Sequence, residues 1–187
     1  DRIDLRNAAN AKALTIYGEN AGDIGADSLR IADIDDDGLD DILFGSPINA
    51  GAGRESAGDL KVIFGSEQPF PAIVDTANNP PSVPIFQIVA PDAGDMFTYS
   101  LATGDVDGDG FIDLVPNAMG GDGAGNRLDA AGESYIISGK WFSQRAGRGA
   151  QNSPLLTSVT VAPDRKKIYA GEPGIVLTLN NASTDAS

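Results

Sequence analysis

Two short stretches of the sequence place aspartates at alternating positions with the same spacing. The first runs from Asp33 to Asp41, and the second runs from Asp105 to Asp113. In both, aspartates occupy positions 1, 3, 5 and 9, and glycine occupies position 6. Short carboxylates at alternating positions can face one centre, and Ca²⁺ binds about six to eight oxygen ligands. Glycine at position 6 permits the tight turn that brings the carbonyl group of position 7 to the same centre.

One such stretch alone would also fit an ordinary acidic turn or an EF-hand. Asp and Gly are common residues of solvated turns, but turn composition does not reproduce the same spacing twice. An EF-hand requires a bidentate Glu at position 12, where this chain has Phe44 and Pro116. Without a cation, four neighbouring carboxylates would repel one another strongly. The sequence therefore predicts two Ca²⁺ sites in loops that are not EF-hands.

The composition of the 187-residue chain argues against several classes of function. A formal net charge of −14 argues against binding nucleic acid or an anionic membrane through a basic patch. Because the sequence lacks Cys and His, it lacks disulfides, thiol nucleophiles, the commonest general base and most zinc sites. No apolar run approaches the ~20 residues of a membrane span. We expect such an acidic protein to work where calcium is plentiful, outside the cell or at its surface.

The sequence also repeats itself. At the offset that separates Asp33 from Asp105, Ala21-Gly22-Asp23 aligns with Ala93-Gly94-Asp95. Further along, the second copy contains two extra residues, after which Ala57-Gly58 aligns with Ala131-Gly132. Repetition over this length indicates a duplicated structural unit.

The sequence of each unit predicts short β-strands. Its apolar and β-branched runs are bounded by Gly and Asp turns, and no long helical period occurs. The predicted strands are 13–17, 28–32, 41–45 and 59–64, then 85–89, 99–103, 112–116 and 133–138, with each acidic loop as a hairpin connection. A Pro-rich surface loop is expected from Glu67 to Pro84. The expected division is 1–140 for the repeat units (about 13–66 and 85–140), 141–158 for a linker or surface loop, and 159–187 for a degenerate third repeat or the first strands of a β-sandwich.

Residues around the acidic loops carry a resemblance to a known repeat. In the first unit they are Ser28-Leu29-Arg30-Ile31-Ala32-Asp33, Asp41-Ile42-Leu43-Phe44-Gly45-Ser46-Pro47 and Ala57-Gly58-Asp59-Leu60-Lys61-Val62-Ile63-Phe64-Gly65, and in the second Phe97-Thr98-Tyr99-Ser100-Leu101-Ala102-Thr103-Gly104-Asp105. Over roughly residues 13–140 the chain resembles FG-GAP repeats, the blades of the integrin α-subunit β-propeller and of many bacterial surface proteins. It departs from that pattern in its longer repeat, in Gly25 where Phe is usual and in Thr98 where Gly is usual. The resemblance implies an all-β fold of FG-GAP-type β-propeller blades that form an incomplete propeller.

The resemblance also implies the ligands of each cation. Four aspartate side chains and the backbone carbonyl of position 7 would bind it. In the first loop these residues are Asp33, Asp35, Asp37, Asp41 and Leu39, and in the second they are Asp105, Asp107, Asp109, Asp113 and Phe111. Two Ca²⁺ ions are thus the expected cofactors.

These expectations favour a calcium-stabilised extracellular structural or adhesion module within a larger surface or filament protein. A propeller needs about 4–8 blades to close, and a solitary repeat leaves apolar faces exposed. We therefore expect the chain to be a piece of a longer polypeptide, or to pack against other blades or protein subunits. A surface protein or a glycan is a further candidate ligand. Calcium-binding spacers in a filament would have the same sequence features.

A polysaccharide-active lyase or a carbohydrate-binding propeller is the alternative. Arg54 and Arg127 recur in equivalent loops of the two units. A lyase would need a Lys, Tyr or Arg base beside a cation that acidifies the substrate, and the aromatic residues that could stack on a sugar are Tyr99, Tyr135 and Trp141. Ion pairs of the arginines with Glu55 or Asp129, and ordinary packing of the aromatics, explain the same residues. The sequence therefore names no catalytic residue.

Overall fold

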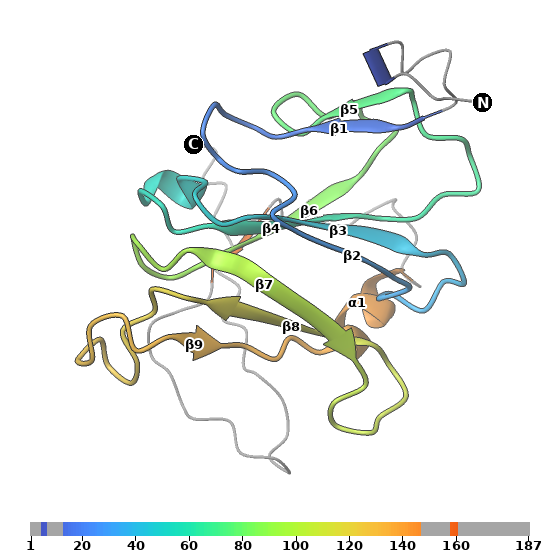
Figure 1. Cartoon of the computed structure of the whole chain (residues 1–187). Helices are drawn as coiled ribbons and strands as arrows, with labels where there is room; N and C mark the ends of the chain where they lie inside the picture. Colours follow the sequence, from blue (N-terminus) through green and yellow to red (C-terminus); the bar gives the residue numbers. More distant parts are fainter. Residues whose placement is uncertain (1–4, 7–12, 147–157, 161–187) are drawn as a thin grey trace, which may run out of the picture.

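The structure is a computed structural model that describes residues 5–6, 13–146 and 158–160. In chain order its elements are β1 (Thr15–Tyr17), β2 (Ser28–Ala32), β3 (Asp41–Ser46), a 3-10 turn (Gly51–Gly53), β4 (Asp59–Ile63), β5 (Ile73–Asp75), β6 (Ile85–Val89), β7 (Phe97–Gly104), β8 (Asp113–Ala118), β9 (Glu133–Ser134), α1 (Gly139–Ala146) and β10 (Ser158–Thr160). Figure 1 shows three layers, with the sheet that contains β2, β3, β4 and β6 between the β1–β5 pair and the sheet of β7, β8 and β9.

The larger sheet has the strand order β10-β6-β4-β3-β2. Strands β2, β3, β4 and β6 pair antiparallel, whereas β10 pairs parallel with β6. Alternate side chains of a strand point to opposite faces of a sheet, so Leu60 and Val62 of β4 enter one core cluster and Ile63 enters another. Every residue of β4 is buried, because both faces of the sheet are covered at this strand.

The main core lies between the larger sheet and the antiparallel sheet β7-β8-β9. Leu43 and Leu60 from the first sheet pack in the same cluster as Leu101 and Leu114 from the second. These four side chains are at most 1 % exposed. Because fully burying a leucine contributes about 1.5–3 kcal/mol, this interface holds the two sheets together.

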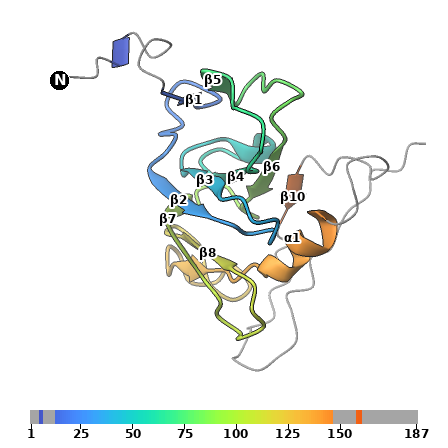
Figure 2. The same ribbon diagram turned by 90° about the vertical axis from the view of Figure 1, so that its right-hand side faces the viewer.

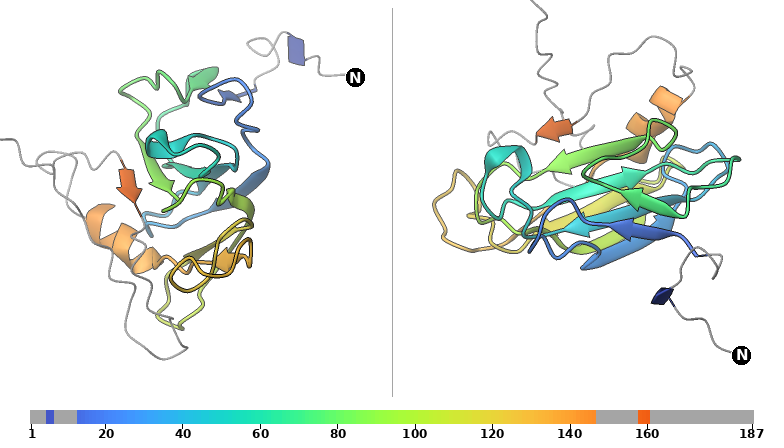
Figure 3. Two further views of the ribbon diagram at one scale, coloured as in Figure 1. Left: turned by 90° about the vertical axis from the view of Figure 1, so that its left-hand side faces the viewer. Right: turned by 90° about the horizontal axis from the view of Figure 1, so that it is seen from above.

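A smaller cluster covers the opposite face of the larger sheet. It joins Ile63 to Val74 of β5 and to Val83, and Ile16 of β1 packs against it. Figure 3 shows the β1–β5 pair lying over this face. The stretch from Glu67 to Pro84, expected to be a surface loop, therefore contains a strand and two buried valines that anchor it to the sheet.

Helix α1 was not expected from the sequence. It has eight residues, too few for a clear helical period, and it begins at the end of the second predicted unit. Its Trp141 and Phe142 pack against Phe86 of β6, with ring centroids 5.5 and 5.6 Å away. Figure 2 shows the helix beside the two sheets. Within the described residues, no helix has the length and apolar character needed to cross a membrane.

The all-β expectation is confirmed at a coarse level, because the described residues form strand-rich sheets with one short helix and no closed barrel. The predicted strands 28–32 and 85–89 have the observed bounds, and 13–17, 41–45, 59–64 and 99–103 differ from the observed strands by at most two residues at either end. Residues 85–89, expected to open the second unit, pair with β4 of the first. Strand 112–116 runs instead from Asp113 to Ala118, and strand 133–138 reduces to β9 and a bridge between Leu114 and Ile137. The prediction for 159–187 falls outside the described residues, apart from the end of β10.

The duplication is visible in equivalent backbone hydrogen bonds. In both units the same loop positions donate to the same acceptors. The equivalent N–H to carbonyl bonds are Ile48 to Asp23 and Gly120 to Asp95, Ala57 to Arg54 and Ala131 to Leu128, and Gly58 to Asn49 and Gly132 to Gly121. The two units therefore share the local backbone structure that carries their acidic loops.

Candidate metal centres

Each acidic loop connects two antiparallel strands, β2 to β3 in the first unit and β7 to β8 in the second. Both loops lie at the same end of their sheets (Figure 1). In each loop the aspartates of positions 1, 3 and 5 form a triad whose ligand oxygens lie within 4.8 Å of one another: Asp33, Asp35 and Asp37 in the first, and Asp105, Asp107 and Asp109 in the second. Oxygens that bind one Ca²⁺ at about 2.3–2.6 Å lie up to about 5 Å apart. Each triad can therefore hold one metal ion.

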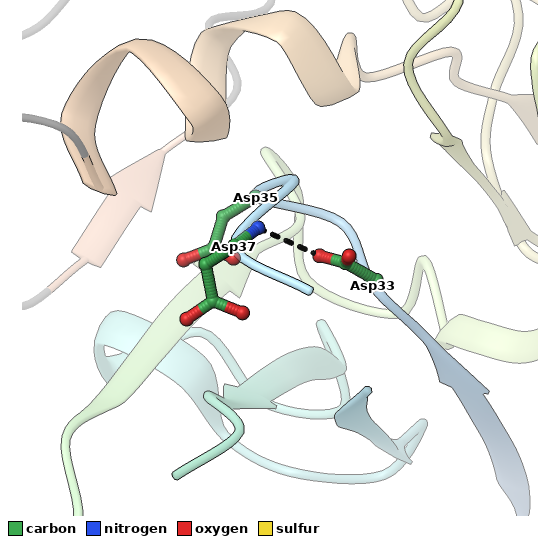
Figure 4. A group of neighbouring side chains, drawn as sticks. All are labelled: Asp33, Asp35 and Asp37. Carbon is green, nitrogen blue, oxygen red and sulfur yellow. Dashed lines mark hydrogen bonds between the residues drawn. The ribbon is translucent and has the colours of Figure 1, made fainter. Parts of the chain in front are cut away.

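Backbone N–H groups fix the side chains of the first triad (Figure 4). The Asp33 carboxylate accepts hydrogen bonds from the N–H groups of Asp37 at 3.1 Å and Gly38 at 2.9 Å. The Asp37 carboxylate accepts one from Leu39 at 2.8 Å. The second loop repeats the pattern, with N–H groups of Gly108, Asp109 and Gly110 donating to Asp105 and that of Phe111 donating to Asp109. Hydrogen bonds to ionised carboxylates are the stronger kind, so they hold the carboxylates in place against their mutual repulsion.

Two positions in each loop have a left-handed backbone. Position 6 is Gly38, with φ of 89°, or Gly110, with φ of 91°, and glycine adopts this conformation without steric cost. Position 4 is Gly108 in the second loop but Asp36, with φ of 59°, in the first. A left-handed residue with a side chain costs roughly 1 kcal/mol. The first loop therefore carries a strained residue where the second has glycine.

The aspartates of position 9 lie outside the triads, and both of their oxygens accept backbone hydrogen bonds. Asp41 accepts from the N–H groups of Ile34 at 2.9 Å and Gly65 at 2.7 Å. The equivalent bonds to Asp113 come from Val106 at 2.9 Å and Gly139 at 3.0 Å. Each carboxylate thus ties the start of its loop to the end of the hairpin that follows. A role of Asp41 and Asp113 as ligands stays a prediction, as does that of the carbonyl groups of Leu39 and Phe111.

Gly65 and Gly139 belong to this arrangement, although the sequence did not point to their role. A Cβ atom on Gly65 would lie 2.7 Å from the Cβ of Leu39, and one on Gly139 would lie 2.1 Å from the carbonyl oxygen of Ile112. Only a residue without a side chain lets the backbone come close enough to donate to the position-9 carboxylate. Gly65 and Gly139 align with each other at the same offset as Ala57 and Ala131, and this alignment was the available signal.

The electrostatics of the first triad centre on Asp35. Its side chain is only 8 % exposed, and its Oδ1 atom has no hydrogen-bond partner. Burial, with repulsion from Asp41, Asp37 and Asp33, raises the pKa of Asp35 from its ordinary 3.8 to about 6. Buried carboxylate oxygens without a partner are rare in folded proteins. A bound cation would supply that partner and favour the charged form of Asp35.

The residues proposed for a carbohydrate site are mostly engaged elsewhere. The Arg54 guanidinium donates to the carbonyl of Ala90 at 2.7 and 3.0 Å, in place of the expected pair with an acid. Tyr135 donates its hydroxyl to Glu133, and its ring lies 5.7 Å from that of Phe97. Trp141 packs against the core, while Tyr99 and Arg127 are exposed. The contacts of the described residues do not bring these positions together with either triad.

The acidic loops and their flanking strands are the features on which any family assignment of this chain depends. Comparison with models of protein families and with curated protein sequences gives no match. The similarity to FG-GAP repeats therefore rests on the residues quoted from the sequence. In the structure, each triad lies between two antiparallel strands of a repeated unit.

Proposed function

We propose that this chain is a calcium-stabilised extracellular structural or adhesion module, built from FG-GAP-type propeller blades and binding two Ca²⁺ ions in its acidic loops. The observation that carries the proposal is the first triad, where the buried Asp35 has an oxygen without a partner among converging carboxylates. The second triad, at the equivalent place in the repeat, supports it.

Calcium would have an architectural role in this proposal. Each loop is a hairpin connection, and its position-9 carboxylate binds the glycine that follows the next strand. A cation that neutralises the triad would therefore stabilise the end of the whole sheet. Extracellular sites have dissociation constants of about 10⁻⁴–10⁻³ M. At a calcium concentration ten times the dissociation constant, each site would stabilise the fold by about 1.4 kcal/mol.

The proposed partners are further blades or other protein subunits, and the support for them is an exposed apolar strand. Leu101 of β7 is 1 % exposed, because it packs between the two sheets. The equivalent residue in the first unit, Leu29 of β2, is 47 % exposed, and the nearby Ile31 is 56 % exposed. The first sheet thus exposes, on its edge strand β2, the leucine that is equivalent to one through which the second sheet packs, with Ile31 exposed beside it. A further sheet that packed there would bury both side chains.

A calcium titration of the full chain by calorimetry, with thermal melts in calcium and in chelator, tests the proposal. We expect two binding events in the micromolar to millimolar range and a melting temperature that falls in chelator. Asp35→Asn should weaken binding, whereas Asp40→Asn, at an exposed position outside the triad, should not. Absence of binding, or binding without a change in melting temperature, would refute the architectural role.

A carbohydrate-active function receives less support. A lyase needs a base beside a cation, and the described contacts place Arg54 on a backbone carbonyl and Tyr135 on Glu133. No observation joins these side chains to the triads. The same titration repeated with uronate polymers present would detect a glycan ligand as a change in the binding heat.

A further inference from the structure

The two acidic loops differ in one charged contact. The Nζ atom of Lys140 lies 3.4 Å from an Asp109 carboxylate oxygen and 5.6 Å from the ring centroid of Phe111. Asp109 and Phe111 are positions 5 and 7 of the second loop. At the equivalent place in the first unit, directly after Gly65, the chain has Ser66, whose hydroxyl accepts a hydrogen bond from Gln68. No ion pair with the first triad is present among the described residues.

The burial of the two loops also differs. At position 2, Ile34 is 1 % exposed and belongs to the main core, whereas Val106 is 52 % exposed. At position 3, Asp35 is buried with one unpartnered oxygen, whereas Asp107 is exposed to solvent. The central carboxylate of the first triad therefore lacks both solvent and a counter-ion, while the second triad has both.

These differences bear on the affinity for a cation. A buried charge without a partner gains most when an ion of opposite charge binds, because the interaction is poorly screened. A solvated carboxylate that is already paired gains less, and its partner must move away or lie close to the incoming ion. Gly139 is the first residue of α1, and its N–H group donates to the Asp113 carboxylate. Lys140 follows directly, so the backbone places the lysine beside the loop.

We propose that the two loops bind Ca²⁺ with unequal affinity. The first loop is the tighter site, and Lys140 is a built-in counter-ion that the second loop must release to bind a cation. This inference rests on the proposed function, because it requires that the triads bind Ca²⁺. Exposed ion pairs are weak, so releasing Lys140 lowers the affinity of the second loop about 1.4- to fivefold.

Reciprocal exchange of Lys140 and Ser66 tests the proposal in the full chain by calorimetric titration with CaCl₂. Lys140→Ser should tighten the weaker site about 1.4- to fivefold and leave the tighter site unchanged. Ser66→Lys should weaken the tighter site. Asp37→Asn and Asp109→Asn, at equivalent positions, assign each binding event to its loop. Lys140 is half exposed and Ser66 is exposed, so both exchanges leave the core intact. Lys140→Gln is a second variant, whose side chain is closer in length to that of lysine.

The outcomes separate the two proposals. Two sites with one affinity, or a weaker site that Lys140→Ser and Lys140→Gln both leave unchanged, would overturn the unequal-site inference while the calcium function stands. A weaker site that Asp37→Asn removes would assign it to the first loop and overturn the inference as well. Absence of any binding heat and of any calcium effect on the melting temperature would overturn both.

Discussion

Replacing Asp35 with Asn should raise the stability of the protein without calcium and should reduce the stability that the protein gains from calcium. Asn has nearly the shape of Asp but no charge, so it removes the buried carboxylate while the loop keeps its volume. In the structure that carboxylate has an unpartnered oxygen and is repelled by Asp33, Asp37 and Asp41. Without a cation its charge is therefore unfavourable to the fold, and with a cation the same charge becomes a ligand.

The size of the effect follows from the pKa of Asp35. Burial raises this pKa to about 6 in the folded protein, from an ordinary 3.8 that we assign to the unfolded chain. Between these pH values the folded state binds more protons than the unfolded state, so the free energy of unfolding falls as the pH rises. Each pKa unit corresponds to about 1.4 kcal/mol, which limits the loss to about 3 kcal/mol above pH 6. Since the loop can relax, we expect about 1–2 kcal/mol.

Thermal melts of the wild-type chain and Asp35→Asn in chelator, from pH 4 to pH 8, measure this difference. At pH 7 the variant should melt higher by about 2–8 °C, because a chain of this size gains roughly 2–4 °C for each kcal/mol. At pH 4 the two proteins should melt together, since Asp35 is then protonated in the folded wild type. In millimolar calcium the wild type should gain stability and the variant should gain less.

The matched control is Asp40→Asn, which removes the charge of an exposed neighbour outside the triad. Its free energy of unfolding should differ from that of the wild type by no more than about 0.5 kcal/mol in both buffers, as expected of a surface substitution. A wild type that is more stable than Asp35→Asn in chelator at pH 7 would show that the carboxylate is satisfied without a cation. A difference in melting temperature between the wild type and Asp35→Asn that does not depend on pH would refute the electrostatic explanation.

Three further predictions test the repeat itself by thermal or urea unfolding. Asp36→Gly should stabilise the protein by about 0.5–1 kcal/mol with or without calcium, because glycine relieves the left-handed strain that Gly108 avoids in the second loop; a loss of stability would show that the Asp36 side chain makes a contact worth more than the strain. Gly65→Ala should destabilise the protein by about 1–3 kcal/mol, because the new Cβ atom clashes with Leu39. The control Gly104→Ala, whose Cβ atom would meet no atom within 4 Å, should be close to neutral. Equal effects of the two substitutions would refute the role of Gly65. Leu101→Ala should lower the free energy of unfolding by about 2–5 kcal/mol. Leu29→Ala, at the equivalent exposed position, should lower it by less than about 0.5 kcal/mol. A large loss of stability from Leu29→Ala in the isolated chain would show that this face of the sheet is already covered.

The loops and strands of this protein could be predicted from local sequence because their determinants are local. Alternating aspartates, a glycine at position 6 and flanking β-branched runs all act within about ten residues of one another. These patterns placed β2, β3 and β4 within one residue of their observed bounds, and the aspartates of positions 1, 3 and 5 lie close together in each loop. The second unit could be located because its aspartates and glycines align with those of the first.

The features that the sequence did not reveal depend on contacts between distant segments. Helix α1 is stabilised by the packing of Trp141 and Phe142 on Phe86, which lies far earlier in the chain. Strand β5 lies in a Pro-rich stretch and forms because Val74 is buried against Ile63. The bonds from Gly65 and Gly139 to the position-9 aspartates likewise cross 24 and 26 residues. No local pattern encodes such pairs.

The same separation between local and distant determinants explains why two loops of one sequence pattern have different energetics. Ile34 is buried because the second sheet packs against the first, and Asp35 loses solvent beside it. Val106 and Asp107 keep their exposure because no described residue covers the second loop in that way. A further unit stacked on the second sheet, as the second is stacked on the first, would bury Val106 and desolvate Asp107. Cation binding to the second loop would then be coupled to assembly, since the desolvated carboxylates would favour a bound Ca²⁺ and the ion in turn would favour the stacked state.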